Sequence, residues 1–313
     1  MRDLLVADRP GWAYDILAKS IKRHSAFSEI DIQYIVDIRR DTSKMDFSNY
    51  DVVFFFLWYD AMRYGVKIKG FEFAKTCVGV HSLASWKKRK LNQEQTSMIC
   101  NQFAATGVIS NEINALLDLT SGFITPNGIE SDLFYPTDLP DFQDGIRIMW
   151  VGNPGRSHHG DNKGFHSLVK PVLDEFSDRG VHLVTASPDS PVPRELMGEF
   201  YRSNHMLICA SLHEGGPMPI VESLACGRPV ITTSVGIVPE IVEDGKNGII
   251  FNRSISDLRN TVEMVLNKPQ LIERMASLAT ETVSNRYAKN MAQSYDIMFK
   301  FVHEKNNRGE TDE

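Results

Sequence analysis

The sequence predicts an α/β protein of two domains, each built on a parallel sheet covered by helices. Short apolar runs of about four to eight residues alternate with segments in which apolar residues recur at three and four positions. The first pattern is typical of buried strands and the second of amphipathic helices, so their alternation indicates βαβ units. At 313 residues the chain is long enough for two such domains.

Composition and charge exclude several other classes of protein. The chain is 42% hydrophobic and 24% charged, and its four cysteines (Cys77, Cys100, Cys209, Cys226) show no C-x-x-C spacing, so we expect reduced thiols. No apolar run has the length of a signal peptide or of a membrane-spanning helix, so a cytoplasmic protein is expected. The formal charge of −6 is shared evenly, with 16 Lys/Arg against 19 Asp/Glu in residues 1–145 and 18 against 21 beyond them. A nucleic-acid acceptor is therefore disfavoured.

The first domain is predicted at residues 1–140. Strands are expected at residues 4–8, 30–37, 51–58, 75–82 and 106–110, and helices at residues 13–24, 86–103 and 111–119. Ligands of parallel sheets bind where the strands end. Gly11 lies in the turn after the first strand and His81 at the end of the fourth, so both are expected at this edge of the sheet. For each, a structural role (a turn glycine, a histidine closing a strand) is the alternative.

A basic run follows His81. Residues 86–90 read Trp-Lys-Lys-Arg-Lys. Such a run is usually a solvated face, and its alternative role is contact with an anionic acceptor or with an anionic membrane surface.

The second domain is predicted at residues 141–285, after a polar, turn-rich hinge at residues 137–145. Strands are expected at residues 146–151, 181–187, 205–211 and 230–233. Helices are expected at residues 165–176 and 194–203, in a segment around Ile220 to Leu224, and twice within residues 256–285. A long amphipathic helix at residues 286–305 and a polar tail at residues 306–313 complete the chain.

Residues 211–251 carry the main functional signal. Gly215 and Gly216 follow the strand at residues 205–211 and precede a helix, so helix N-terminal amides, including that of Met218, should lie at the carboxyl edge of the sheet. Glycines let an anion approach the backbone closely. Glu214 and Glu222 frame this turn with seven residues between them, and carboxylates can accept hydrogen bonds from sugar hydroxyls.

In this segment the chain resembles the retaining GT-B glycosyltransferases of the glycosyltransferase 4 group, whose mark is E-x7-E. The residues from Glu222, Glu-Ser-Leu-Ala-Cys-Gly-Arg-Pro-Val-Ile, are similar to that group's E-A-x-A-C-G-x-P-V-I. Glu240-Ile-Val-Glu-Asp-Gly-Lys-Asn-Gly is similar to its E-I-V-x-D-G-x-N-G, and residues 124–136 to its I-P-N-G-V-D…F-x-P. The resemblance implies the GT-B fold, two Rossmann-like domains facing across a cleft, with the last helix crossing back to the first domain.

The resemblance also implies a function. The implied reaction transfers a sugar from a nucleotide-sugar (a UDP- or GDP-sugar) to a glycan or lipid-linked acceptor. It retains the configuration of the sugar and needs neither a metal nor a cofactor. Glu214 would orient the donor sugar and Glu222 the ribose, while His81 would lie near the sugar and the acceptor. Lys163 and Arg156 would neutralise the diphosphate. Further donor contacts are expected at Gly11, Gly152, Gly215, Gly216 and Met218.

The chain departs from that group in three places. Asn153 follows Gly152 where the group has an arginine, and Arg156 lies three residues further on. Gly11 alone remains of a glycine-rich first turn, and Pro217, which has no N–H, replaces a glycine. Two alternatives therefore stay open: a non-catalytic sugar-nucleotide-binding partner subunit, and a sugar-nucleotide epimerase of the same fold.

Overall fold

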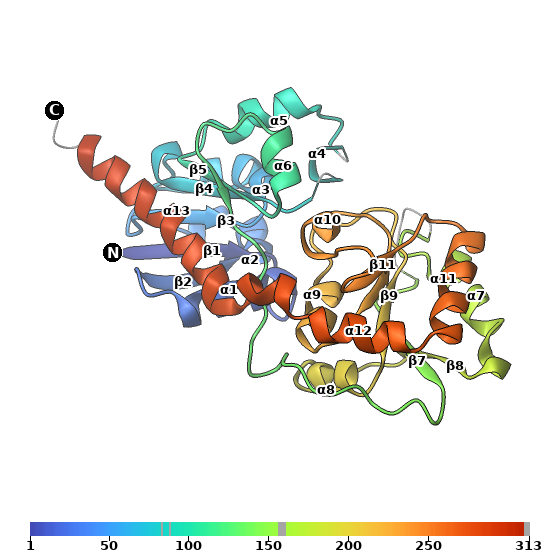
Figure 1. Cartoon of the computed structure of the whole chain (residues 1–313). Helices are drawn as coiled ribbons and strands as arrows, with labels where there is room; N and C mark the ends of the chain where they lie inside the picture. The colour runs from blue at the N-terminus through green and yellow to red at the C-terminus, as the bar shows by residue number, and fades with distance from the viewer. Residues whose placement is uncertain (83, 88, 156–160, 310–313) are drawn as a thin grey trace. The chain divides into compact units, whose positions relative to one another are not determined.

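A computed structural model describes residues 1–82, 84–87, 89–155 and 161–309, and its contacts divide the chain into two units (Figure 1). The first unit comprises Met1–Gly128 and Arg286–Glu313, and the second Ile129–Asn285. Each unit contains a parallel sheet with helices packed against it, which confirms the predicted fold class of two Rossmann-like domains. Among the described residues, no helix is both long and apolar enough to cross a membrane.

The sheet of the first unit has the strand order β2-β1-β3-β4-β5-β6. Its strands are β1 (Arg2–Ala7), β2 (Glu29–Tyr34), β3 (Val52–Phe55), β4 (Thr76–Val80), β5 (Ala105–Val108) and β6 (Gly122–Ile124). Its helices are α1 (Ala13–His24), α2 (Ile35–Arg40), α3 (Trp58–Arg63), α4 (Ala84–Lys87), α5 (Gln93–Cys100), α6 (Asn111–Leu116) and α13 (Ala288–Gly309). The strands β3, β4 and β5 are buried along their whole length, as strands covered on both faces must be.

Helix α13 belongs to the core of the first unit although it lies at the other end of the chain. It packs beside α1, as Figure 1 shows, and also contacts β3 and β5. Tyr295 and Phe299 are fully buried and meet the ring of Phe54 on β3 with centroids 5.3 and 6.2 Å away. At the far end, the ring of His303 lies 2.9 Å from the buried carboxylate of Asp3.

Several predicted boundaries in the first unit were wrong, each for a local reason. The apolar run from Val52 ends as a strand at Phe55, and Trp58 already begins a helix, because a fully buried run has no period that separates strand from helix. The predicted strand at residues 30–37 ends at Tyr34, because helix α2 begins at Ile35. The helix predicted at residues 86–103 is interrupted, since Asn92 starts α5 with a capping box.

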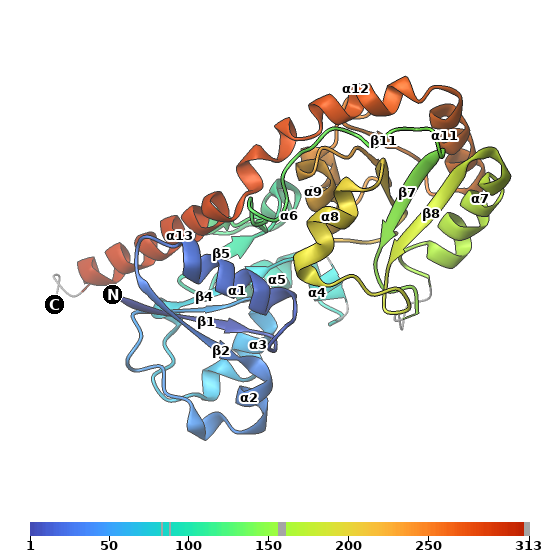
Figure 2. The ribbon, with the colours of Figure 1, turned by 90° about the horizontal axis from the view of Figure 1, so that it is seen from below.

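The sheet of the second unit has the strand order β11-β10-β9-β7-β8. Its strands are β7 (Ile146–Val151), β8 (Val181–Ala186), β9 (Met206–Cys209), β10 (Val230–Thr232) and β11 (Gly248–Ile250). Its helices are α7 (Lys170–Asp174), α8 (Met197–Arg202), α9 (Met218–Ala225), α10 (Val238–Ile241), α11 (Ile255–Asn267) and α12 (Gln270–Leu278). A single π-helical turn at Phe165–Val169 replaces the start of the helix predicted at residues 165–176. Figure 2 shows α8 beside α9, and the two helices are in contact.

Residues 129–140 group with the second unit, whereas the sequence analysis assigned them to the first domain. Arg228 provides the physical reason. Its side chain is fully buried and donates to the carbonyl oxygens of Thr137 and Asp138, each at 2.8 Å, and to that of Arg202 at 2.7 Å. A buried guanidinium has five N–H groups to satisfy, and carbonyls of the linker accept several of them.

Candidate functional site

Strand order places a candidate site in the second unit at the ends of β7 and β9. Chain order and spatial order diverge there, because β7 is flanked by β8 on one side and β9 on the other. In open parallel sheets the two loops that leave such a pair of strands diverge and create a crevice for a ligand. The loop after β7 leads to Lys163, and the loop after β9 leads to Glu214.

Lys163 and Glu214 meet at this edge. The Lys163 ammonium lies 2.9 Å from Glu214 Oε1, which also accepts a hydrogen bond of 2.9 Å from the Ser211 hydroxyl. Burial lowers the pKa of Lys163, but the adjacent Glu214 carboxylate offsets this, and the net pKa is raised. Lys163 therefore stays charged in this half-buried position, as a ligand for phosphate requires.

The glycines predicted to contact the donor divide into two groups. Gly152 donates its amide to Ala186 in the sheet, and a Cβ there would lie 2.9 Å from Lys163 Cδ, so this glycine makes room for the lysine. The amides of Gly215, Gly216 and Met218 form no hydrogen bond within the described part of the chain, and these residues lie at the N-terminal end of α9. These amides remain available to an anion.

Glu222, on the inner face of α9, is 4% exposed and engages both of its oxygens. Oε1 forms a short ion pair with the Arg194 guanidinium. Oε2 accepts a hydrogen bond of 2.8 Å from the Tyr201 hydroxyl. Neither Arg194 nor Tyr201 was singled out from the sequence, because no spacing rule connects them to a glutamate more than twenty positions later.

The first unit has its own change of strand order at β1 and β3, with the turn Arg9 to Trp12 leaving β1. Gly11 has φ +78°, which explains a glycine at that position. Its amide donates to Asp15 Oδ2 at 2.7 Å, and Tyr34 donates to the other oxygen of Asp15 at 2.9 Å. The Gly11 amide is therefore already bonded, and the turn is fixed by the buried Asp15 carboxylate.

His81, at the end of β4, lies between aromatic rings. Its ring centroid is 5.0 Å from that of Tyr14 and 5.9 Å from that of Phe56. The side chain is 7% exposed, and neither ring nitrogen has a hydrogen-bond partner within the described residues. Burial lowers the pKa of His81 to about 4, so the ring is neutral at physiological pH.

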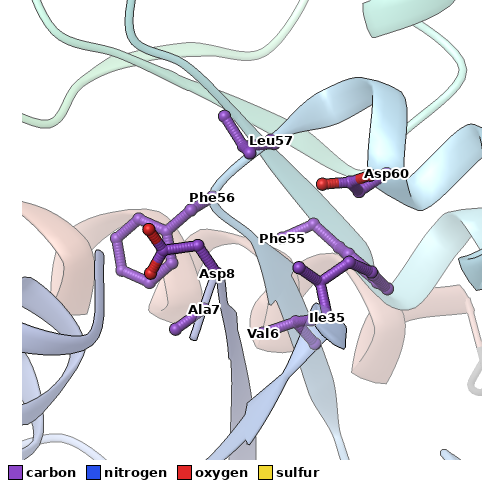
Figure 3. A pocket seen from close by; sticks show the side chains of 8 residues that line it. All are labelled: Val6, Ala7, Asp8, Ile35, Phe55, Phe56, Leu57 and Asp60. Carbon is purple, nitrogen blue, oxygen red and sulfur yellow. The ribbon is translucent and has the colours of Figure 1, made fainter. Parts of the chain in front are cut away.

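A small pocket adjoins this edge of the first sheet (Figure 3). Phe56 and Leu57 line it together with the carboxylates of Asp8 and Asp60. Each carboxylate has one buried oxygen without a partner in the described part of the molecule, and burial raises the pKa of both. The Arg39 guanidinium, 2.8 Å from the other oxygen of Asp60, opposes that rise.

Arg156, predicted as a phosphate ligand, lies outside the described residues. Within the described ranges, Asp3, Asp51 and His303 are close enough to share a metal ion. Asp3 and Asp51 lie where β1 and β3 begin, at the other edge of the first sheet from Gly11 and His81, and His303 lies on α13.

Part of the second unit is similar to a family of known proteins. Residues 190–282, which contain Arg194, Tyr201, Glu214 and Glu222, match the family model described as glycosyl transferases group 1. A solved structure of Anabaena Alr3699/HepE in complex with UDP superposes on 96% of this chain and on 100% of its own, with a TM-score of 0.68 and 15% sequence identity. The protein has the GT-B fold.

The curated relatives match only a part of this chain. The lipopolysaccharide 1,2-N-acetylglucosaminetransferase of Salmonella typhimurium is 26% identical over 246 residues, which are 71% of this chain and 63% of that protein. The D-inositol 3-phosphate glycosyltransferase of Thermomonospora curvata is 26% identical over 140 residues, 44% of this chain and 30% of that protein. This GT-B protein thus spans less than two thirds of the length of the curated relatives it matches.

Proposed function

We propose that this protein is a glycosyltransferase that moves a sugar from a nucleotide-sugar donor to a glycan or lipid-linked acceptor. The observation that supports this most is the group of complementary side chains and amides at the carboxyl edge of the second sheet. The ion pair of Lys163 with Glu214, the free amides of Gly215 and Gly216, and the buried Glu222 lie around one turn. Cations and amides suit a diphosphate, and carboxylates suit hydroxyl groups.

Each group has a role in the proposed transfer. As the glycosidic bond to the diphosphate breaks, negative charge grows on the bridging oxygen, and Lys163 stabilises it together with the free amides of the α9 turn. Arg156 is proposed as a second cation. Glu214, which forms an ion pair with Lys163 in the ligand-free protein, accepts hydrogen bonds from hydroxyl groups of the donor sugar. Because the chain itself supplies this positive charge, we propose that the transfer needs no metal. We also propose that it moves a hexose with retention of configuration, as in the glycosyltransferase 4 group that the sequence resembles.

Relatives support a UDP-sugar as the first donor to test, since Anabaena Alr3699/HepE has been solved with UDP and with UDP-glucose. The acceptor is proposed to contact the first unit, where Arg89 lies 3.1 Å above the Tyr59 ring. Two relatives are named for a lipopolysaccharide and for an inositol phosphate, both compatible with an anionic acceptor at this arginine. Contact of residues 86–90 with an anionic membrane is part of the same proposal.

The test is a panel of UDP-, GDP-, ADP- and dTDP-sugars, measured by thermal shift and by release of the nucleoside diphosphate. We expect one nucleotide to stabilise the wild-type protein and to be released slowly without acceptor, and we expect Glu222→Ala to abolish both effects. A donor that binds but is never cleaved with any acceptor would favour the non-catalytic binding subunit. Interconversion of donor sugars without nucleotide release would favour an epimerase. Absence of nucleotide binding would refute the proposal.

A further inference from the structure

A third segment of the chain joins the loop of Lys163 to the end of β9. Asp161 precedes Lys163 in the loop after β7, and Ala210 directly follows β9. Arg253, between β11 and α11, donates from Nε to the carbonyl oxygen of Ala210 and from Nη2 to that of Asp161, each at 2.9 Å. One guanidinium therefore bonds to both loops of the candidate site.

The backbones of these two loops also lie close together beside Lys163. On one side of it, the Asn162 side-chain amide donates to the carbonyl oxygen of His213 at 3.1 Å. On the other side, Gly164 has φ +67°, and a Cβ there would lie 2.6 Å from the Ala210 carbonyl oxygen. The residues on either side of Lys163 are therefore held against the loop after β9.

The end of β9 is a firm support for this contact. Ala210 is fully buried, and the next residue, Ser211, accepts a hydrogen bond of 2.6 Å at its carbonyl oxygen from the Thr233 hydroxyl beyond β10. The loop of Lys163 leaves its own strand at Val151. Through Arg253 this loop gains a bond to the support.

An arginine is suited to such a bond. A guanidinium is planar, and its Nε and one Nη donate in parallel, so two acceptors bound to it stay at a fixed separation. A lysine ammonium at the end of a flexible stem fixes no such separation. The distance between the Asp161 and Ala210 carbonyl groups, and with it the place of Lys163, therefore depends on Arg253.

We propose that Arg253 is a positioning residue that fixes Lys163 against the end of β9, so that the ammonium meets the leaving diphosphate without rearrangement of its loop. The inference rests on the proposed function, because it gives Lys163 the task of stabilising that diphosphate. The hydrogen bonds of Arg253 within the described part of the chain go to backbone carbonyl groups, so it acts through the loop of Lys163. A misplacement of about 1 Å at a reacting site can cost about 10²-fold in rate.

The experiment measures kcat and KM for diphosphate release from the nucleotide-sugar that the wild-type protein cleaves. Arg253→Met should lower kcat by roughly tenfold or more and change donor KM by less than about threefold, because Lys163 acts on charge that develops in the transition state. When Arg253→Met is combined with Lys163→Met, the double variant should be as slow as Lys163→Met alone. A purely structural role would instead multiply the two losses.

Arg253→Lys keeps the positive charge and loses the paired donors, so its kcat should fall nearly as far as that of Arg253→Met. It takes the place of Arg253→Met, alone and with Lys163→Met, if that variant does not fold. Arg259→Met is the matched control, since Arg259 lies in the same unit and joins α11 to Glu175 at the end of α7 with bonds of 2.6 and 2.7 Å. Its kcat should equal that of the wild-type protein.

Wild-type kcat in the Arg253 variants, or losses that multiply with that of Lys163→Met, would overturn the inference and leave the proposed transferase standing. A wild-type protein that binds no nucleotide-sugar, or cleaves none with or without an acceptor, would overturn the proposed function and the inference together.

Discussion

The Lys163–Glu214 pair joins residues that lie 51 positions apart in the chain. Each was predicted as a donor ligand on its own, and their direct contact means that, in the proposed function, the donor would share Lys163 with a carboxylate. The ion pair holds the Lys163 ammonium in position before a ligand binds. Little reorganisation is then needed when negative charge develops on the leaving group.

Lys163→Met should lower kcat by about 10²-fold or more, because loss of one preorganised donor to a developing anion has this effect in other enzymes. Initial rates at saturating donor are the measurement. Lys170→Met is the control, since Lys170 lies in the same unit, forms a surface pair with Asp174 and is 54% exposed. Equal rates for the two variants would remove Lys163 from the proposed mechanism.

His81 should make stability depend on pH. Its folded pKa of about 4 lies below the ordinary value of 6.5, so the unfolded chain binds a proton that the folded chain excludes. The resulting stability is complete above pH 6.5 and is lost as the pH falls toward about 4. Between pH 7 and 5, the free energy of unfolding should fall by about 2 kcal/mol more for wild type than for His81→Leu.

Urea unfolding at the two pH values measures this difference. His213→Leu, which changes an exposed histidine, should behave as the wild-type protein does. If the free energy of unfolding falls equally for wild type and His81→Leu, the pKa of His81 in the folded protein is not depressed, and the prediction is wrong.

At the scale of the elements, the side chain of Arg228 bonds both to the linker and to the end of α8. Arg228 follows α9 and donates both to the linker carbonyls of Thr137 and Asp138 and to the end of α8 at Arg202. Burial lowers the pKa of Arg228 to about 10, which still leaves the guanidinium charged. The linker therefore belongs physically to the second unit.

Arg228→Met should destabilise the second unit by about 3 kcal/mol or more, because several buried carbonyl groups lose their donor at once. Thermal unfolding monitored by circular dichroism tests this. Arg274→Met is the control, since that exposed side chain makes a single long contact of 3.4 Å with a carbonyl oxygen. A comparable melting temperature for both variants would contradict the role given to Arg228.

At the scale of the whole molecule, the first unit is assembled from both ends of the chain. Helix α13 supplies Met291, Tyr295, Met298, Phe299 and Val302 to a core whose other members come from residues 5–105. Burying each such side chain contributes about 1.5–3 kcal/mol, so together they approach the entire net stability of a domain, about 5–15 kcal/mol.

Residues 1–128 expressed alone should therefore fail to fold, whereas residues 129–285 should fold alone. Nuclear magnetic resonance spectra of the two fragments give the measurement, with dispersed amide signals expected only for the second. Covalent attachment of residues 286–309 to the first fragment should restore its spectrum. A folded first fragment without that helix would show that α13 is dispensable.

The sequence alone determined the fold class and a large part of the candidate site. Strand β7 and helix α1 were predicted with their observed bounds, because clear hydrophobic periodicity is a local property that packing does not change. The turn after β9 could also be predicted, since two glycines before an apolar helix dictate an anion-accessible N-terminus.

Only the tertiary structure decided which groups meet. Strand order, and with it the adjacency of β7 and β9, depends on pairings between residues far apart in the chain, which no local pattern encodes. The contacts of Tyr201 and Arg194 with Glu222, and the use of the Gly11 amide by Asp15, follow from that packing. Periodicity reports which face of an element is buried, whereas the identity of its neighbours is fixed by the assembled core.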